Sequence, residues 1–425
     1  RGSVDELPVL RAAVPPGGIK HVLVIDLENK GFNETFGPTS PATYLNTVLR
    51  SKGQVVEGYY GIAHFSLPNY IAQVSGQAPN AKTQTDCIGT PYSDIAPGVD
   101  DPNPATNPGQ VDGQGCLYPE PGAGRHGAPT IADQLDAAYP PDPRTHKAAW
   151  RSYNEDMGND PARDGGTPDP AGGTTCAHPV VGGTDNSVAA TATDQFAMRH
   201  SPFLWFRSTV DAQAECDANV VPLGTLRANG KPARRGHLAR DLELSRTTPR
   251  FGFIAPNLCN DAHDGDHGPC AGSDSEGRHD GGLISADRWL KHWMPLILHS
   301  PAYRSGSMLV VVTFDEADVN PADPGYASSC CYEQSGPNTA SPGLVGQALN
   351  SLPGGGRTGA VLLNRRWIKP GTVNITGQYN HYSALRSYED LLGLTRGGTD
   401  GKGHLGFAGA PGLVPFGPDV FNRNR

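Results

Sequence analysis

The sequence contains no apolar run long enough to cross a membrane, which takes about 18 residues. We therefore expect no transmembrane helix and no contact with the membrane interior. Basic residues form no stripe or long run, and the net charge is −9, which argues against a nucleic acid as the main partner. The densest basic cluster is Lys231–Arg235, which we interpret as a solvated loop.

Aromatic residues are scarce as well, at 7%, whereas there are 54 glycines and 39 prolines. This composition predicts turn-rich connections around a compact sheet rather than long helices. A chain of 425 residues can bury a large core. Because no repeat or linker is evident, we predict a single domain over residues 1–425, with its core at about 20–395.

The cysteines form no Cys-x-x-Cys pair and no zinc-finger spacing. All 8 lie in loops rich in glycine, proline and aspartate, so we predict up to four disulfides and an oxidising compartment. We expect the adjacent Cys330 and Cys331 to pair with different partners, because a bridge between neighbours is strained. The chain starts at Arg1 without a signal peptide, and Arg1–Ser3 is either a vector remnant or the start of a processed mature form. The cysteines favour the second interpretation, so we expect a secreted or extracytoplasmic protein.

Five short apolar segments flanked by turn residues have the character of strands buried on both faces. They alternate with segments of helical periodicity, which predicts an α/β fold with a mostly parallel central sheet flanked by helices. The predicted strands are His21–Leu27, Lys147–Tyr153, Arg250–Ala255, Met308–Phe314 and Gly359–Leu363.

Three segments with helical spacing lie between these strands or after them. They are Ala128–Ala138, Ser285–His299 and Tyr382–Leu392. Gly393 follows the last one as a natural C-cap. Three long turn-rich segments are interpreted as insertions that roof a site. They are Gly89–Gly127, Asn159–Asp185 and Val319–Leu352.

Two of the predicted strands end in polar pairs. Glu28 and Asn29 follow the first, and Asp315 and Glu316 follow the fourth. Ligands of open parallel sheets bind beyond the carboxyl ends of the strands, so we expect these side chains to meet there. Four oxygen-bearing side chains repel one another unless a cation lies between them, and such a set suits Ca²⁺, Mg²⁺ or Mn²⁺. The alternative is that Glu28 and Glu316 are solvated residues at strand ends.

Ser66 precedes Pro68 at the start of a short helical segment that stops at Gly76. Serine is a favoured N-cap, so a plain helix cap is one interpretation. A helix N-terminus is also an anion site, because its free N–H groups and positive dipole end face the ligand. A serine hydroxyl placed there beside a divalent ion can ionise and attack phosphorus. Asn69, one turn further, would then add a donor to the phosphoryl oxygens.

Three histidines lie near predicted strand or helix ends, namely His200, His263 and His381. Phosphoryl transfer needs donors for the equatorial oxygens and an acid for the leaving group, and histidines in such positions can provide them. An isolated histidine is more often structural or exposed. The segment around His263 also allows a separate metal site with Asp261, His263 and His267 as ligands, although it is not an EF-hand loop.

Five segments together form a signature: HVLVIDLENKGFNETFG, SLPNYIAQVSGQ, FIAPNLCNDAHD, VVTFDEAD and YNHYSALRSYEDLLGL. In this order the chain resembles the phosphoesterase family, which contains bacterial acid phosphatases and phosphatidylcholine-type phospholipases C. That family belongs to the alkaline phosphatase-like superfamily, whose fold we therefore expect. The resemblance runs from about His21 to Leu394, and the five motifs in order are more specific than each one alone.

The resemblance implies a role for each matching polar residue. Glu28 and Asn29 match the metal-binding pair of the family, and Asp315 and Glu316 match its second acidic pair. Ser66 matches the nucleophile, which is also a metal ligand.

The resemblance also covers the three histidines. His263 matches a histidine that holds the transferred phosphoryl group. His200 matches another, more loosely, from a segment that reads His-x-Pro-Phe. His381 belongs to the NHYS motif and is implied as an active-site residue without a specific role.

The chain departs from the phospholipase C branch, which typically has a threonine nucleophile, a tryptophan-rich His-Asp segment and extra C-terminal domains. Ser66 in SLPNY is more similar to the acid-phosphatase branch. We therefore predict a metal-dependent phosphomonoesterase with a phosphoseryl intermediate and a small phosphate ester as substrate.

Two alternatives remain open at this point. One is a phosphodiesterase or phospholipase C that uses the same nucleophile and metal. The other is a non-catalytic protein that binds a metal or phosphate. A wide apolar mouth favours diesters, and a narrow pocket lined by arginine or lysine favours monoesters. The sequence does not predict an oligomeric state.

Overall fold

The computed structural model describes residues 13–122, 127–141, 148–227, 236–263, 270, 280–320, 322–326, 328–331, 336–339 and 354–423. An eight-stranded sheet lies at its centre. The strand order is β13 (Thr372–Asn374), β2 (Gln54–Val56), β12 (Ala360–Leu363), β11 (Met308–Phe314), β1 (His21–Leu27), β10 (Phe251–Ala255), β6 (Trp150–Asn154) and β9 (Val220–Pro222). β12 is antiparallel to both neighbours, and the other strands share one direction. The predicted mostly parallel α/β sheet is therefore confirmed.

All five predicted strands belong to this sheet. β1 and β11 have the predicted bounds, and β10 and β12 begin one residue later than predicted. β6 begins at Trp150, and Lys147 at the start of that prediction lies outside the described residues. The sequence missed β2, β9 and β13, because three residues are too few to show a periodicity.

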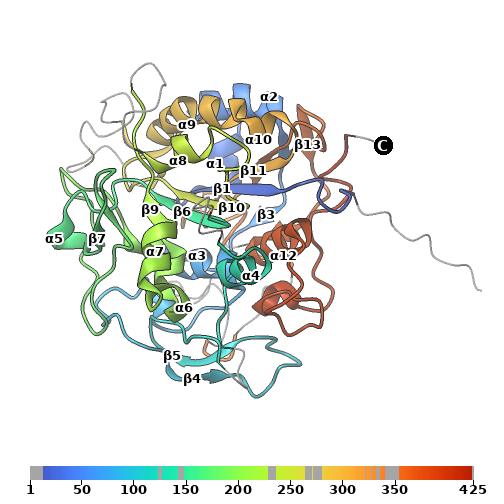
Figure 1. Cartoon of the computed structure of the whole chain (residues 1–425). Helices are drawn as coiled ribbons and strands as arrows, with labels where there is room; N and C mark the ends of the chain where they lie inside the picture. Colours follow the sequence, from blue (N-terminus) through green and yellow to red (C-terminus); the bar gives the residue numbers. More distant parts are fainter. Residues whose placement is uncertain are drawn as a thin grey trace, which may run out of the picture.

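Helices cover both faces of the sheet, and the alternation of β1 shows why. Val22 and Val24 pack with α3 (Ser66–Ser75), α4 (Ile131–Ala138) and α12 (His381–Leu392) in one core. Leu23 and Ile25 point the other way, into a core with α9 (Gly282–His299), α10 (Pro301–Arg304) and α8 (His237–Asp241). Figure 1 shows α9 and α10 above the strands and α3, α4 and α12 below them. Both faces of β1 are buried, as its continuous apolar run predicts.

The three predicted helices are α4, α9 and α12. α4 begins at Ile131 because Thr130 caps it in a reciprocal capping box with Asp133. α9 begins earlier than predicted, at Gly282. α12 ends at Leu392, and Gly393 has a left-handed φ of 69°, so the predicted C-cap is confirmed.

Short elements connect this framework. The short helices are α1 (Phe32–Phe36), η1 (Leu45–Leu49), α2 (Arg50–Lys52), η2 (Thr83–Thr85), α5 (Pro161–Asp164), η3 (Met198–His200), η4 (Pro202–Trp205), α6 (Arg207–Val210), α7 (Gln213–Asn219) and η6 (Gly406–Gly409). The small sheets pair β3 (Tyr59–Tyr60) with β14 (Tyr379–Asn380), β4 (Ala96–Asp100) with β5 (Val111–Gln114), and β7 (Thr167–Pro168) with β8 (Thr174–Thr175). No helix among the described residues is long and apolar enough to cross a bilayer.

Four disulfides are formed, as predicted. They are Cys87–Cys116, Cys176–Cys216, Cys259–Cys270 and Cys330–Cys331. The expectation of separate partners for Cys330 and Cys331 was wrong, because the other six cysteines pair among themselves. Asn380 Nδ2 donates to the carbonyl oxygens of both Cys330 and Cys331, at 3.2 and 3.1 Å, which holds the turn in place. The predicted basic loop Lys231–Arg235 lies outside the described residues.

Candidate functional site

The site begins at the end of β1. Alternation along the strand puts Glu28 on the same side as Val22 and Val24, which is the side of α3. Ser66 is the first residue of α3, and its Oγ donates to Glu28 Oε2 at 2.8 Å. Glu28 is 0% and Ser66 only 4% exposed, so this hydrogen bond is shielded from water.

Ser66 is not a helix cap, so the plain-cap interpretation is wrong. Its hydroxyl donates to a carboxylate instead of accepting from a helix N–H, and Phe65 occupies the N-cap position with a left-handed φ of 81°. Asp86 caps the helix from a distance, because its Oδ1 accepts from Leu67 N at 2.8 Å. The backbone N–H of Leu67, which we expected to face a bound anion, thus donates to the Asp86 carboxylate instead.

Asn29 and Asp315 bring the ends of β1 and β11 together. The backbone N–H of Asn29 donates to Asp315 Oδ1 at 3.2 Å, and Asn29 has a left-handed φ of 41° that turns the chain away from the strand. Its side-chain amide directs one atom at Glu28 Oε2 and Asp315 Oδ1, at 3.1 and 3.3 Å, and the other at His263 Nε2, at 3.1 Å.

This amide fits in two orientations. With its NH₂ group toward the carboxylates, it donates to both, and its oxygen accepts from His263 Nε2. With its carbonyl toward them, oxygens of Asn29, Glu28 and Asp315 converge without a proton between them. Such convergence is unfavourable unless a cation lies between the oxygens or a carboxyl is protonated.

Glu316 is committed to a partner that the sequence did not indicate. Its Oε2 lies 2.7 Å from His64 Nδ1, and His64 Nε2 lies 2.8 Å from the Tyr326 carbonyl oxygen. Burial lowers the pKa of His64 to about 4 and raises the pKa of Glu316 well above its usual value. Both shifts favour an uncharged pair in which protonated Glu316 donates to His64, which donates to Tyr326.

His200 and His263 reach the site from two further segments. His200 Nε2 lies 3.1 Å from Glu28 Oε1, and its ring stacks on Tyr70 of α3 at a centroid distance of 5.0 Å. Burial and the charge of Arg199 lower the pKa of His200 well below its usual value, so the ring is neutral. His263 follows Asp261, whose Oδ1 accepts its backbone N–H at 2.9 Å.

His381 holds the backbone rather than facing the pocket. Its Nε2 donates to the Asp315 carbonyl at 2.5 Å, and its Nδ1 lies 3.1 Å from the Tyr59 hydroxyl. Both ring nitrogens are occupied and the side chain is 0% exposed. His381 therefore positions the end of β11 and is not among the residues that line the pocket described below, so its implied catalytic role stays a prediction.

Asn69 likewise contacts backbone groups, so its expected contact with phosphoryl oxygens stays a prediction. Its Oδ1 accepts from Ile62 N and Ala63 N at 2.8 and 3.2 Å. Its Nδ2 donates to the carbonyls of Ala63 and Phe65 at 2.8 and 2.9 Å. Both the oxygen and the nitrogen of the amide are thus hydrogen-bonded to the loop that precedes Ser66.

A pocket of about 310 Å³ opens over Ser66. Arg199, which the sequence did not suggest, is the only arginine among the described residues that line this pocket. Arg199 Nη1 donates to the Val188 carbonyl at 2.8 Å, and its Nε lies 3.8 Å from Asp86 Oδ2. The lining residues are Asn29, His64, Phe65, Ser66, Asp86, Arg199, His263, Glu316, Asp318 and Val319.

The predicted insertions contribute little to this lining. No described residue of Gly89–Gly127 or Asn159–Asp185 lines the pocket, so the prediction that these two roof it is not supported. Val319 is the only described residue of the third segment that does. Most of that segment, and His267 of the alternative metal site, lie outside the described residues.

Among the described residues, the site has more carboxylates than positively charged side chains. Burial, Asp315 and Asp261 raise the pKa of Glu28, and burial, Glu316 and Asp26 raise that of Asp315. Asp315 Oδ2 is buried without a hydrogen-bond partner among the described residues. No described group of three or more His, Cys, Asp or Glu side chains is arranged as a metal site. If a divalent cation binds here, the oxygen donors that suit it are Glu28, Asn29, Ser66 and Asp315, two carboxylates with an amide and a hydroxyl.

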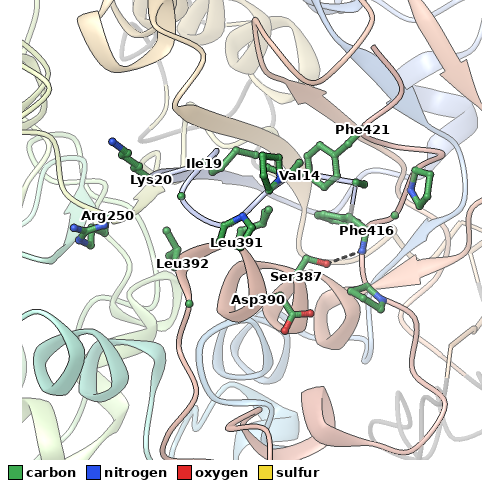
Figure 2. A pocket seen from close by; sticks show the side chains of 18 of the residues that line it. Val14, Ile19, Lys20, Arg250, Ser387, Asp390, Leu391, Leu392, Phe416 and Phe421 are labelled. Carbon is green, nitrogen blue, oxygen red and sulfur yellow. Dashed lines mark hydrogen bonds between the residues drawn. The ribbon is translucent and has the colours of Figure 1, made fainter. Parts of the chain in front are cut away.

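A larger pocket of about 880 Å³ lies away from this site. Figure 2 shows its mainly apolar wall, with Ile19, Phe416 and Phe421, and Lys20 and Arg250 at one side. Lys20 and Arg250 precede β1 and β10, so the pocket lies at the opposite edge of the sheet from Ser66. It contains none of the site residues predicted from the sequence, so its size does not make it the reactive centre.

No curated protein sequence matches the chain. Solved structures with a similar arrangement include an alkaline phosphatase superfamily protein from Vibrio parahaemolyticus, at 13% identity over 92% of this chain and 72% of that one, with a TM-score of 0.43. The phosphonate monoester hydrolase SpPMH from Silicibacter pomeroyi is 12% identical over 96% and 77%, with a TM-score of 0.36. Likenesses of this size identify no residue or activity of this chain.

The sequence comparison is stronger. The profile of the Phosphoesterase family matches residues 40–395, which includes Ser66, His200, His263, Asp315 and Glu316. Glu28 and Asn29 lie before the matched range, and the hydrogen bond to Ser66 joins Glu28 to it. A match over most of the chain confirms the resemblance read from the five motifs. The chain belongs to the phosphoesterase family and is a hydrolase of phosphoric or closely related esters.

Proposed function

We propose that this protein is a phosphomonoesterase that depends on a divalent metal and acts through a phosphoseryl intermediate. The observation that carries the proposal is the 2.8 Å hydrogen bond from Ser66 Oγ, which lines the pocket, to the buried Glu28 Oε2. A buried hydroxyl that donates to a carboxylate is aligned as a nucleophile, with an acceptor ready for its proton.

The reaction has two steps. Ser66 Oγ attacks phosphorus, its new O–P bond forms as the ester O–P bond breaks, and its proton passes to Glu28. The released alcohol takes up a proton from solvent. Water then attacks phosphorus as the O–P bond to Ser66 breaks, Ser66 Oγ regains its proton from Glu28, and inorganic phosphate departs. Arg199 and His263 line the pocket and offer N–H donors to the non-bridging oxygens during both steps.

The proposed metal ligands are Glu28, Asn29, Ser66 and Asp315. A bound divalent ion would supply the positive charge that lowers the pKa of the Ser66 hydroxyl. The all-oxygen donor set suits Ca²⁺, Mg²⁺ or Mn²⁺. Glu316 is not included in this set because its Oε2 is hydrogen-bonded to His64, and its implied role as a ligand stays a prediction.

The pocket supports monoesters over diesters as substrates. Its volume of about 310 Å³ is at the small end of ligand sites, and Arg199 is positioned to pair with charge. A monoester carries up to two negative charges near neutral pH, whereas a diester carries one and adds a second bulky group. A phosphodiesterase or phospholipase C is therefore the second candidate.

We also propose that the enzyme acts outside the cytoplasm, on a small phosphate ester. Four disulfides support this, because thiols stay reduced in most cytosolic proteins.

The test compares hydrolysis of p-nitrophenyl phosphate and bis-p-nitrophenyl phosphate by wild type and Ser66→Ala. Each protein is assayed before and after chelation and after return of Mg²⁺, Mn²⁺ or Ca²⁺. The proposal expects monoester turnover that vanishes in Ser66→Ala and on chelation and returns with a metal. Preference for the diester selects the second candidate. Turnover that survives in Ser66→Ala overturns the mechanism, and inactivity on both substrates favours a binding protein.

A further inference from the structure

A third pocket, of about 520 Å³, gathers basic side chains from separate parts of the chain. Its basic lining residues are Lys52, His299, Arg304, Arg365 and Arg423. No Asp or Glu occurs among the described residues that line it. The protein as a whole has a net charge of −9, so a pocket lined by basic residues without acidic ones differs from the average charge of its surface.

The pocket lies at the edge of the sheet opposite to Ser66. Lys52 lies two residues before β2, Arg304 precedes β11, and Arg365 follows the antiparallel β12, so all three mark the amino edge of the parallel strands. Figure 1 shows α2 and α10 in the same upper part of the molecule. A ligand in this pocket therefore does not reach the catalytic pocket.

Local structure does not explain these charges. Within the described part of the chain, Lys52, Arg304, Arg365 and Arg423 form no ion pair with a carboxylate. A helix dipole stabilises cations at a C-terminus, and His299 ends the 18-residue α9. The helix dipole stabilises the charges of Lys52 and Arg304 only weakly, because α2 and α10 have only 3 and 4 residues.

The pocket has an ordered wall as well as charges. Tyr303 and Asn364 are buried, and Asn364 Nδ2 donates to the carbonyls of Gly306 and Met308 at 2.9 and 2.8 Å. Arg423 donates to the Arg365 carbonyl, which ties the C-terminal segment to the turn after β12. The basic side chains therefore project from anchored backbone.

We propose that this pocket binds a compact oligophosphate, a ligand with two or more phosphate groups. Guanidinium groups pair with phosphate through two parallel hydrogen bonds, and three arginines line this pocket. The volume is within the range of small-ligand sites. Orthophosphate reaches fewer of these cations at once, so it binds more weakly. The proposal does not depend on the chemistry at Ser66.

The test measures tripolyphosphate binding by calorimetry in the Ser66→Ala background, which prevents turnover. The pocket variant is Arg304→Gln/Arg365→Gln. The control is Arg246→Gln/Arg396→Gln, which removes the same charge from exposed positions that do not line the pocket. We expect the pocket variant to raise the Kd at least about tenfold and the control to change it less than about twofold.

Equal weakening in both variants would show diffuse attraction to the surface and overturn the proposal. Unchanged binding in the pocket variant would place the ligand elsewhere, and no binding at millimolar tripolyphosphate would also refute it. Thermal unfolding of each variant checks folding, and Lys52→Gln/Arg423→Gln serves as a second pocket variant. Turnover of p-nitrophenyl phosphate by the pocket variant with Ser66 intact separates this site from the catalytic one, because we expect it to be unchanged.

Discussion

Ser66 and Glu28 are separated by 38 residues in the sequence and joined by a buried hydrogen bond of 2.8 Å. Glu28 comes from the end of a central strand, and Ser66 comes from the start of the helix that packs on the same face. The pair therefore forms only when the sheet and the helix layer are assembled. It is both a packing contact and the starting geometry of the proposed reaction.

Ser66→Ala separates these two roles. We expect the turnover of p-nitrophenyl phosphate to fall at least about a thousandfold, because the nucleophile is gone. The free energy of unfolding should fall by only about 1 kcal/mol, the value of one hydrogen bond. The matched control is Ser75→Ala at the other end of α3, whose hydroxyl donates to the Ile71 carbonyl. An active Ser66→Ala protein would contradict the proposed role.

Asp315→Asn tests the cation. Asp315 is buried among other carboxylates, so the metal-free variant should be more stable than metal-free wild type by roughly 1–3 kcal/mol. The order should reverse when a metal is bound, because the variant loses a ligand. Urea unfolding with a chelator and with Mn²⁺ measures both effects. If Mn²⁺ stabilises the variant as much as wild type, Asp315 is not a ligand.

Arg199→Gln tests the recognition of charge. We expect kcat/KM for the monoester to fall roughly 10- to 100-fold, since a charge-assisted contact to phosphate is lost. The fall for bis-p-nitrophenyl phosphate should be smaller, because that substrate carries less negative charge. Arg246→Gln serves as the control. An equal loss on both substrates would mean that Arg199 holds the structure through Asp86 and Val188 rather than selecting monoesters.

Asn69→Ala tests a positioning role. The variant leaves the N–H groups of Ile62 and Ala63 without their buried acceptor, so we expect a loss of roughly 2–4 kcal/mol in unfolding free energy. The kcat should fall with little change in KM, because the loop before Ser66 shifts. A raised KM in a fully stable protein would instead indicate direct contact with the substrate.

His404→Gln tests a pH-dependent contact far from Ser66. His404 lies between Asp400 and Asp390, at 2.7 Å from each, and these carboxylates raise its pKa. A raised pKa in the folded state stabilises the protein most below the unfolded pKa of about 6.5, and the effect disappears as pH rises through the folded value. The variant should therefore lose roughly 1 kcal/mol at pH 5.5 and almost nothing at pH 9. Equal losses at both pH values would refute the ionic contribution.

Much of the fold could be predicted because the central strands are apolar on both faces and end abruptly. β1 and β11 have the predicted bounds, and Asn29 and Asp315, which follow them, meet as expected. The short strands β2, β9 and β13 could not be predicted, because their pairing partners, rather than their own three residues, make them strands.

The site was predicted in part for the same reason. Glu28, Asn29 and Asp315 converge because strand direction is encoded locally and parallel strands share an edge. The commitments of Asn69 and His381 to backbone groups could not be predicted, since a side chain's free capacity depends on which loop packs against it.

The sequence by itself determined the family and the strand ends that Glu28 and Asp315 follow. It also identified Ser66 as the candidate nucleophile. Only the tertiary structure decided which groups remain available there. It pairs Glu316 with His64, places Asp86 at the N-terminus of α3, and brings Arg199 to the pocket. The physical reason is that charge and hydrogen-bonding capacity depend on neighbours distant in the sequence, whereas strand and helix periodicity depend on neighbours close in the sequence.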